Sequence, residues 1–133
     1  MSLRLAAGPS SVPEGRNWVM QVIQHQEAGS DRHAASHRVV ELLTSELLTN
    51  AVTHGPEDGT VVVRASRSRD EVRVEVRDES LELPIVQQVG PEAVSGRGVS
   101  FVDLLSSEWG VILDAGGKTV WFEVDLNQPS ALD

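Results

Sequence analysis

The amino-acid sequence predicts an α+β sandwich in which three helices cover one face of a mostly antiparallel sheet. Two long segments have the apolar spacing of amphipathic helices. Two later segments, residues 60–66 and 71–77, alternate apolar and polar residues as half-buried strands do, and two more flank a glycine-containing turn as the strands of a final hairpin. The order along the chain is strand, helix, helix, two strands, loop, helix, two strands. A chain of 133 residues without internal repeats is expected to form one domain.

The first part of the chain is predicted to contain a short strand and two helices. Residues 2–7 alternate as an edge strand before a Gly-Pro-Ser-Ser turn. Residues 13–27 form an amphipathic helix with a proline at its start. A cap at Ser30 or Asp31 then begins a long helix that ends near His54.

The second part of the chain is predicted to be mostly strands. Residues 60–66 and 71–77 form a hairpin whose second strand has one buried and one solvated face. Residues 78–97 have no strong period and contain several glycines and prolines, so we expect a functional loop. A helix over 98–105 precedes a last hairpin over 109–125. The sequence order therefore completes a sheet of about five strands with a third helix.

Composition restricts the function. The net charge is −9, which argues against nucleic acid as a partner because phosphate binding needs a basic surface. There is no cysteine, no apolar run long enough to span a membrane and no signal-peptide pattern, so we expect a cytoplasmic protein without membrane contact. The domain core is expected at about residues 13–125, with a frayed tail at about 127–133.

The long helix carries polar residues where a structural helix would have aliphatic ones. Glu46 is expected near the centre of the apolar arc, and Asn50 and His54 follow at steps of four, so the three form a polar ladder. The arc consists of Val39, Val40, Leu42, Leu43, Leu47 and Ala51. A buried carboxylate without partners costs several kcal/mol, which favours a functional role over that of an ordinary solvated glutamate.

Two other features allow a functional and a structural interpretation. Asp78 follows a valine-rich strand, where a carboxylate can accept a hydrogen bond from a ligand's amino group or cap a turn. Gly96-Arg97-Gly98 directly precedes a helix, where backbone N–H groups, the helix dipole and an arginine favour anion binding. The same residues also fit an ordinary glycine-containing helix start. Taken singly, neither feature decides between the alternatives.

The Gly117-Lys118-Thr119 sequence superficially matches the end of a phosphate-binding loop. The required earlier glycine is absent, because Ile112 stands at that position, and the segment continues into a strand instead of a helix. We therefore reject a phosphate loop here. A tight hairpin turn accounts for Gly116 and Gly117.

The order of four motifs along the chain resembles that of the GHKL (Bergerat-fold) ATPase superfamily. The motifs are Glu46-xxx-Asn50 on a helix, Asp78 after a strand, Gly96-Arg97-Gly98 before a helix and Thr119 on the last strand. This superfamily includes gyrase-type ATPases and histidine kinases. The small size and the ending GGKTVWFEV are most similar to the anti-sigma factor serine/threonine kinases and their single-domain relatives. The resemblance implies a two-layer α/β sandwich that binds ATP with Mg²⁺.

The resemblance also implies roles for individual residues. Asn50 would bind the Mg²⁺ ion that bridges the nucleotide phosphates, and Glu46 would be the general base. Asp78 would accept a hydrogen bond from the adenine amino group, with support from Thr119. Oxygen ligands suit Mg²⁺, and phosphoryl transfer depends mainly on positioning and charge neutralisation.

Further positions follow from the same resemblance, which covers residues 13–124. Gly96, Arg97 and Gly98 would line the triphosphate, and His54 would also reach the nucleotide. The loop departs from the superfamily pattern DxGxG, because Ser80 and Glu82 replace its glycines. The glutamate adds negative charge to a segment that must approach ATP.

The leading hypothesis is a Mg-ATP-dependent anti-sigma-factor-type serine/threonine protein kinase that regulates a sigma factor by partner switching. Its implied partners are a small anti-anti-sigma (STAS-type) protein and a sigma factor, and relatives of this type often form homodimers. The alternative is a non-catalytic or nucleotide-gated binding module of the same fold. The loop substitutions keep this alternative open.

Overall fold

The computed structural model describes residues 1–25, 34–80 and 97–127 and contains three helices and five strands in these parts of the chain. In chain order they are β1 (Ser2–Ala6), α1 (Ser11–His25), α2 (Ala34–His54), β2 (Thr60–Arg67), β3 (Glu71–Asp78), α3 (Arg97–Leu105), β4 (Glu108–Asp114) and β5 (Gly117–Asp125). The expected order of elements is confirmed. The proposed cap at Ser30 or Asp31, the loop 81–96 and the tail from residue 128 lie outside the described residues.

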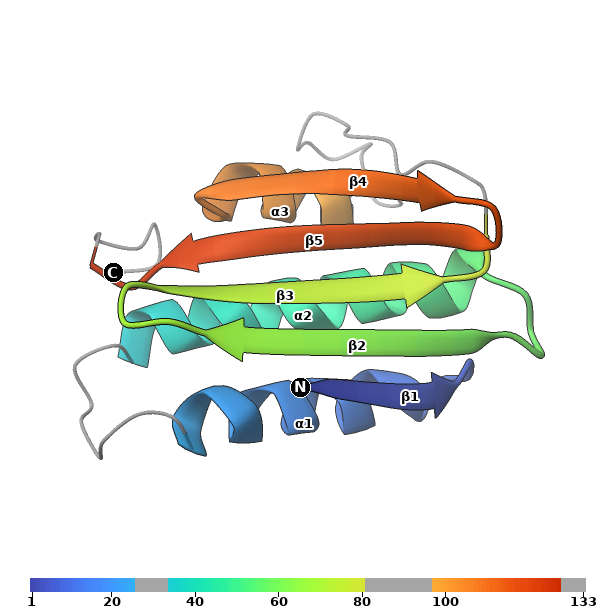
Figure 1. Cartoon of the computed structure of the whole chain (residues 1–133), viewed down its shortest axis with the longest axis horizontal. Helices are drawn as coiled ribbons and strands as arrows, with labels where there is room; N and C mark the ends of the chain where they lie inside the picture. Colours follow the sequence, from blue (N-terminus) through green and yellow to red (C-terminus); the bar gives the residue numbers. More distant parts are fainter. Residues whose placement is uncertain (26–33, 81–96, 128–133) are drawn as a thin grey trace.

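The strands form one antiparallel sheet in the order β1-β2-β3-β5-β4, with β1 and β4 at the edges. All three helices lie behind the sheet in Figure 1: α2 behind β2 and β3, α3 behind β4, and α1 beside β1. The predicted α+β sandwich with helices on one face is therefore confirmed. The C-terminal end of α2 lies at the same end of the sheet as the end of β3 and the start of β5.

Strict alternation along the central strands creates the core. In β3, Val72, Val74 and Val76 are almost completely buried, whereas the residues between them are partly exposed. The same alternation in β2 and β5 turns valines, one alanine and one phenylalanine toward the helices: Val61, Val63, Ala65, Val120, Phe122 and Val124. One face of the sheet is thus apolar and packed, and the other is available to polar side chains.

The first helix begins two residues earlier than its proline suggested. The helix starts at Ser11, so Pro13 lies in the first turn, where a missing N–H leaves no helical hydrogen bond unmade. The buried Ser11 hydroxyl donates to the carbonyl of Ala6 and ties the helix start to the end of β1. This contact fixes the angle at which α1 leaves the sheet and packs on α2.

Candidate functional site

The polar ladder on α2 lies at the border of the buried face. Glu46 and Asn50 are half-buried, and His54, the last residue of the helix, is exposed. The expectation that Glu46 would lie near the centre of the apolar arc is therefore corrected. The buried face extends over Thr44 and Leu48, because α2 packs on α1 as well as on the sheet, and this shifts the centre of the buried face away from Glu46.

Partial burial still changes the chemistry of Glu46. Removal of its carboxylate from water raises its pKa above the usual value for glutamate. A raised pKa makes the ionised form a stronger base, which is the property that a proton-accepting residue needs. Asn50 lies one turn further along α2, also half-buried, and presents an amide oxygen of the kind that Mg²⁺ accepts.

Asp78, the last residue of β3, is buried and forms an ion pair with Lys118. The Asp78 Oδ1 atom lies 3.1 Å from the Lys118 Nζ atom, and both side chains are almost completely enclosed. The same oxygen accepts a hydrogen bond of 2.8 Å from the backbone N–H of Ser80. Of the two roles that the sequence left open for Asp78, the structure shows the cap on a turn; the role toward a ligand's amino group stays a prediction.

The structure does not bring Thr119 to Asp78. In the antiparallel pairing of β3 and β5, Lys118 is the Cα partner of Asp78, and Thr119 is the partner of Arg77. Because side chains alternate between the two faces of a strand, Thr119 belongs to the face away from the helices and Lys118 to the helix side. The residue that supports Asp78 is Lys118.

Sequence reasoning missed Lys118, although a signal for it exists. Val120, Phe122 and Val124 establish which face of β5 is buried, and two residues before Val120 the same face carries Lys118. The assignment followed the residue type, because threonine matched the family pattern. The phase of the strand contained the correct answer.

Gly117 has a second role beyond the hairpin turn. A Cβ atom at this position would lie 2.0 Å from the carbonyl oxygen of Asp78, far inside any allowed contact. Glycine at position 117 thus lets β5 approach the end of β3 closely enough to place Lys118 against Asp78. At the other side of Asp78, a Cβ on Gly55 would lie 3.8 Å from the Asp78 Cβ, so the end of α2 also adjoins this carboxylate.

The remaining predicted site residues are only partly placed. Helix α3 begins at Arg97, so Gly98 lies in its first turn, and Gly96 and Glu82 fall outside the described residues. Helix α3 packs against α2, the helix that carries Glu46 and Asn50. Ser80, which replaces the first loop glycine, is buried next to Asp78 and is accommodated through its backbone hydrogen bond.

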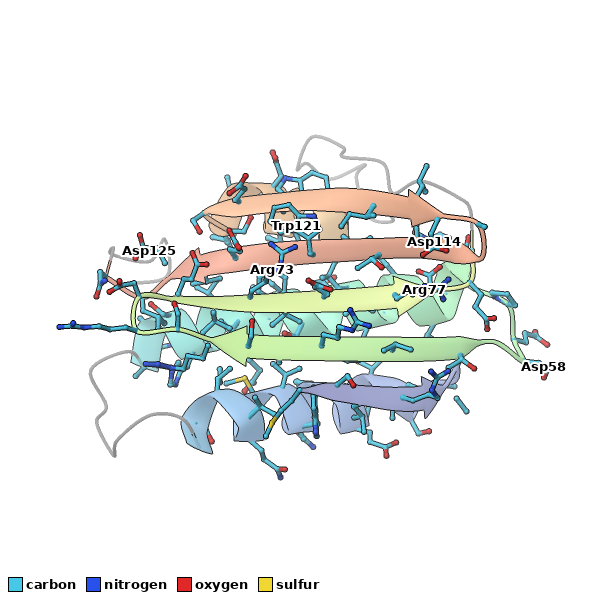
Figure 2. The ribbon with its side chains drawn as sticks, viewed as in Figure 1. Asp58, Arg73, Arg77, Asp114, Trp121 and Asp125 are labelled. Carbon is cyan, nitrogen blue, oxygen red and sulfur yellow. The ribbon has the colours of Figure 1, made fainter. Side chains whose placement is uncertain are left out.

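The opposite face of the sheet carries a separate polar network. In Figure 2 the Arg73, Arg77, Asp114 and Trp121 side chains lie on the face turned away from the helices. A shallow depression on this face is lined by Met1, Ser2, Arg64, Ala65, Ser66, Arg73 and Glu75. It contains none of the predicted site residues. The candidate site is therefore the helix side of the sheet, at the end where α2, β3 and β5 meet.

Two other kinds of feature are missing from residues 1–25, 34–80 and 97–127. In these residues, no three histidine or acidic side chains gather as they would around a metal ion. None of the three helices there is both long and apolar enough to cross a bilayer.

Comparison with known proteins identifies the fold family. The chain resembles the histidine kinase domain from the blue-light activated histidine kinase of Erythrobacter litoralis EL346, with 31% identity and a TM-score of 0.52 over 70% of this chain. The chain spans 46% of that relative's length. The catalytic domain of the histidine kinase ThkA has the same fold, with a TM-score of 0.55 and 15% identity over 94% of this chain and 95% of the other.

A search of curated proteins finds no match. The family model of the histidine kinase-like ATPase domain matches residues 5–124, which run from the last two residues of β1 to the penultimate residue of β5. The chain belongs to the histidine kinase-like ATPase domain family.

Proposed function

We propose that this chain is a Mg-ATP-dependent serine/threonine protein kinase of the anti-sigma factor type. It transfers phosphate to a small STAS-type anti-anti-sigma partner and binds a sigma factor by partner switching. The observation that carries the proposal is the pair on α2: a half-buried Glu46 with a raised pKa, one turn before Asn50. This is the combination of base and oxygen ligand that phosphoryl transfer to a hydroxyl needs.

The residues present fit a magnesium nucleotide. Mg²⁺ takes few ligands from a protein and keeps its waters and the substrate phosphates, so one amide oxygen from Asn50 suffices. The side chains of Glu46 and Asn50 are partly exposed and therefore accessible to a ligand. Asp78 has one oxygen, Oδ2, that accepts no hydrogen bond from the described residues. When bound, Mg-ATP supplies the transferable phosphoryl group and the positive charge that shields it.

Each residue then has a defined task. Glu46 accepts the proton of the attacking serine or threonine hydroxyl, and burial makes it the stronger base for this. Asn50 would hold the metal, and Asp78 would accept a hydrogen bond from the base of the nucleotide. The packing between sheet and helices excludes most water around Asp78, whose side chain is only 5% exposed.

The proposal is tested by phosphate transfer from radiolabelled Mg-ATP to the partner that co-purifies with the chain from its native host. Glu46→Gln should lower transfer at least about a hundredfold, because a general base contributes roughly 10²–10⁴-fold, and should leave Mg-ATP binding intact. Thr49→Ala is the matched control, since Thr49 is exposed and its hydroxyl bonds only to the helix backbone. A transferred phosphate that survives acid indicates a serine or threonine ester instead of phosphohistidine. Equal transfer by wild type and Glu46→Gln would contradict the assigned role of Glu46.

A second function is favoured by a specific observation. The Asp78 carboxylate already holds an ammonium group, and Glu82 brings further negative charge into the loop. A chain of this kind could retain nucleotide binding and gate partner association without transfer. Calorimetry distinguishes the two functions: binding of Mg-ATP without transfer to any co-purifying partner supports the gated module. If the wild-type chain releases no heat with Mg-ATP, both nucleotide-dependent functions are wrong.

A further inference from the structure

Lys118 is an unusual residue to find enclosed in a fold. Lysine side chains are almost never fully buried unless they are paired, and this one is 5% exposed. Its Nζ atom lies 3.1 Å from Asp78 Oδ1, with the two residues directly opposite each other on β5 and β3. The surroundings of this pair therefore need an explanation beyond the pairing of its charges.

The pair leaves hydrogen-bonding capacity unused. An ammonium group has three donors and a carboxylate about four acceptor positions. Among residues 1–25, 34–80 and 97–127, Lys118 donates only to Asp78, and Asp78 accepts only at Oδ1, from Lys118 and from the N–H of Ser80. A buried ion pair is stabilising only when its remaining donors and acceptors are satisfied. Within the described part of the chain, Asp78 Oδ2 and two ammonium N–H groups therefore have no hydrogen-bond partner.

The position of the pair is held rigidly. The close approach that Gly117 permits presses the start of β5 against the backbone of Asp78, and the end of α2 lies on the other side at Gly55. Both charged groups are therefore fixed by strand pairing and not by flexible loops. The Asp78 carboxylate is a hydrogen-bond acceptor and the Lys118 ammonium beside it is a donor. Two such groups side by side can form paired hydrogen bonds with one edge of a planar base.

We infer that Lys118 reads the nucleotide base directly: its ammonium donates to the ring nitrogen N1 of adenine while Asp78 Oδ2 accepts from the 6-amino group. This rests on the proposed function. Adenine presents a donor beside an acceptor on this edge, and guanine presents an oxygen acceptor beside an N–H donor. Guanine in the same orientation would set acceptor against carboxylate and donor against ammonium. Lys118 is thus a specificity-determining residue of the site.

The test compares ATP with 1-deaza-ATP, in which carbon replaces N1 and removes the acceptor. Calorimetry of the wild-type chain with each magnesium nucleotide should show 1-deaza-ATP binding roughly ten- to hundredfold more weakly, as expected for losing a hydrogen bond to a charged group. Lys118→Met should bind ATP more weakly and show no difference between the two nucleotides. Equal binding of both nucleotides by the wild type, or the same ratio in Lys118→Met, would overturn the inference.

A second variant guards against loss of folding. Lys118→Met leaves Asp78 buried without its partner, whereas the double variant Asp78→Asn with Lys118→Met removes both charges and keeps the side-chain volumes. If only the double variant is folded by circular dichroism, it replaces the single variant and should likewise fail to discriminate the two nucleotides. Failure of the wild type to bind ATP at all would contradict the proposed function, whereas binding without discrimination would contradict only the role of Lys118.

Discussion

Gly116 and Gly117 are neighbours in one hairpin, but an added methyl group would meet very different atoms at the two positions. At Gly117 it would collide with the Asp78 carbonyl oxygen, and at Gly116 the nearest atom is the Arg77 Nη2 atom, 3.0 Å away at the end of a flexible side chain. We expect Gly117→Ala to lower the free energy of unfolding by about 2–3 kcal/mol, because the paired strands must separate. Urea denaturation measures this change.

Gly116→Ala is the matched control for this prediction. The Arg77 guanidinium can move away, and its exposed ion pair with Asp114 contributes little, so the loss should stay below about 1 kcal/mol. Equal losses in the two variants would show that close approach to Asp78 is not the reason for glycine at position 117.

Glu46 should make stability depend on pH. Burial raises its pKa, so the folded protein keeps this proton to a higher pH than the unfolded chain does. The contribution of Glu46 to stability is therefore fully present below the unfolded pKa and is lost as the pH rises through the folded pKa. At neutral pH, Glu46→Gln should be more stable than wild type by less than about 1 kcal/mol, because solvent screens a half-exposed group.

The measurement is urea denaturation of wild type and Glu46→Gln between about pH 3 and 8. The difference between their free energies of unfolding should shrink toward zero near and below the ordinary glutamate pKa of about 4.3. A wild type more stable than Glu46→Gln at neutral pH, with this advantage lost on acidification, would mean that Glu46 is stabilised in its charged form, contrary to the burial that the structure shows.

The success of sequence reasoning about single residues depended on the element that carries them. Asp78 could be singled out from the sequence because a charged residue after a run of alternating valines is unusual, and its role at a ligand stays a prediction. Thr119 follows from the family resemblance alone, whereas the alternation along β5 places Lys118 on the buried face beside Asp78. Glu46 was placed too centrally because a helical wheel shows which residues share a side, but not that α1 covers part of it. Errors of this kind arise because a single sequence does not show which elements pack against a given helix or strand in the folded chain.

At the scale of elements, the outer face of the sheet depends on Arg73. Its Nε atom lies 2.9 Å from Glu75, its Nη1 atom lies 3.0 Å from Glu123 on β5, and its guanidinium stacks 4.1 Å above the Trp121 ring (Figure 2). This one side chain thus links β3 to β5 by the ion pair with Glu123 and the cation–π contact with Trp121, and its pair with Glu75 lies within β3. Partial burial by itself would lower the pKa of the guanidinium, but the hydrogen bonds and charges of the two glutamates together outweigh it and raise the pKa, so the group remains charged.

Arg73→Lys should lower the free energy of unfolding by about 0.5–1.5 kcal/mol. Lysine keeps the charge but loses the planar group that stacks on Trp121 and bonds two carboxylates at once. Arg64→Lys is the control, because Arg64 is exposed on the same face and makes none of these contacts; its change should be within about 0.5 kcal/mol. Chemical denaturation measures the free energy of unfolding of both variants. Similar decreases for Arg73→Lys and Arg64→Lys would contradict a special role of the contacts that Arg73 makes with Trp121 and the two glutamates.

The bounds of the strands were easier to predict from the sequence than the order in which the strands pair. The alternation of valines specified β2 and β3 to within one residue at each end, because one face of a strand must be apolar to cover the helices. The sheet order was not predictable in the same way. The two hairpins follow from local turns, but the pairing of β3 with β5, which creates the site at Asp78, joins residues far apart in the chain.

At the scale of the whole molecule, the proposed site depends on three segments that meet only in the folded chain. Glu46 and Asn50 come from α2, Asp78 from β3 and Lys118 from β5. None of these segments contains the site alone. A ligand held by all of them must bind the folded state in preference to the unfolded one, and binding must therefore raise stability by mass action.

Mg-ATP at about a hundred times its dissociation constant should raise the free energy of unfolding by about 2.7 kcal/mol and the melting temperature by several degrees. The rise should depend on Mg²⁺, because in the proposed site Asn50 would hold the metal that accompanies the phosphates. Asn50→Ala at the same nucleotide concentration should lose most of the Mg²⁺-dependent increase, whereas Thr49→Ala, on the exposed side of the same turn, should keep it. Thermal unfolding followed by circular dichroism, with and without EDTA, measures both effects. An increase that is the same in wild type and Asn50→Ala would place the phosphates away from α2 and contradict the assigned orientation of the nucleotide.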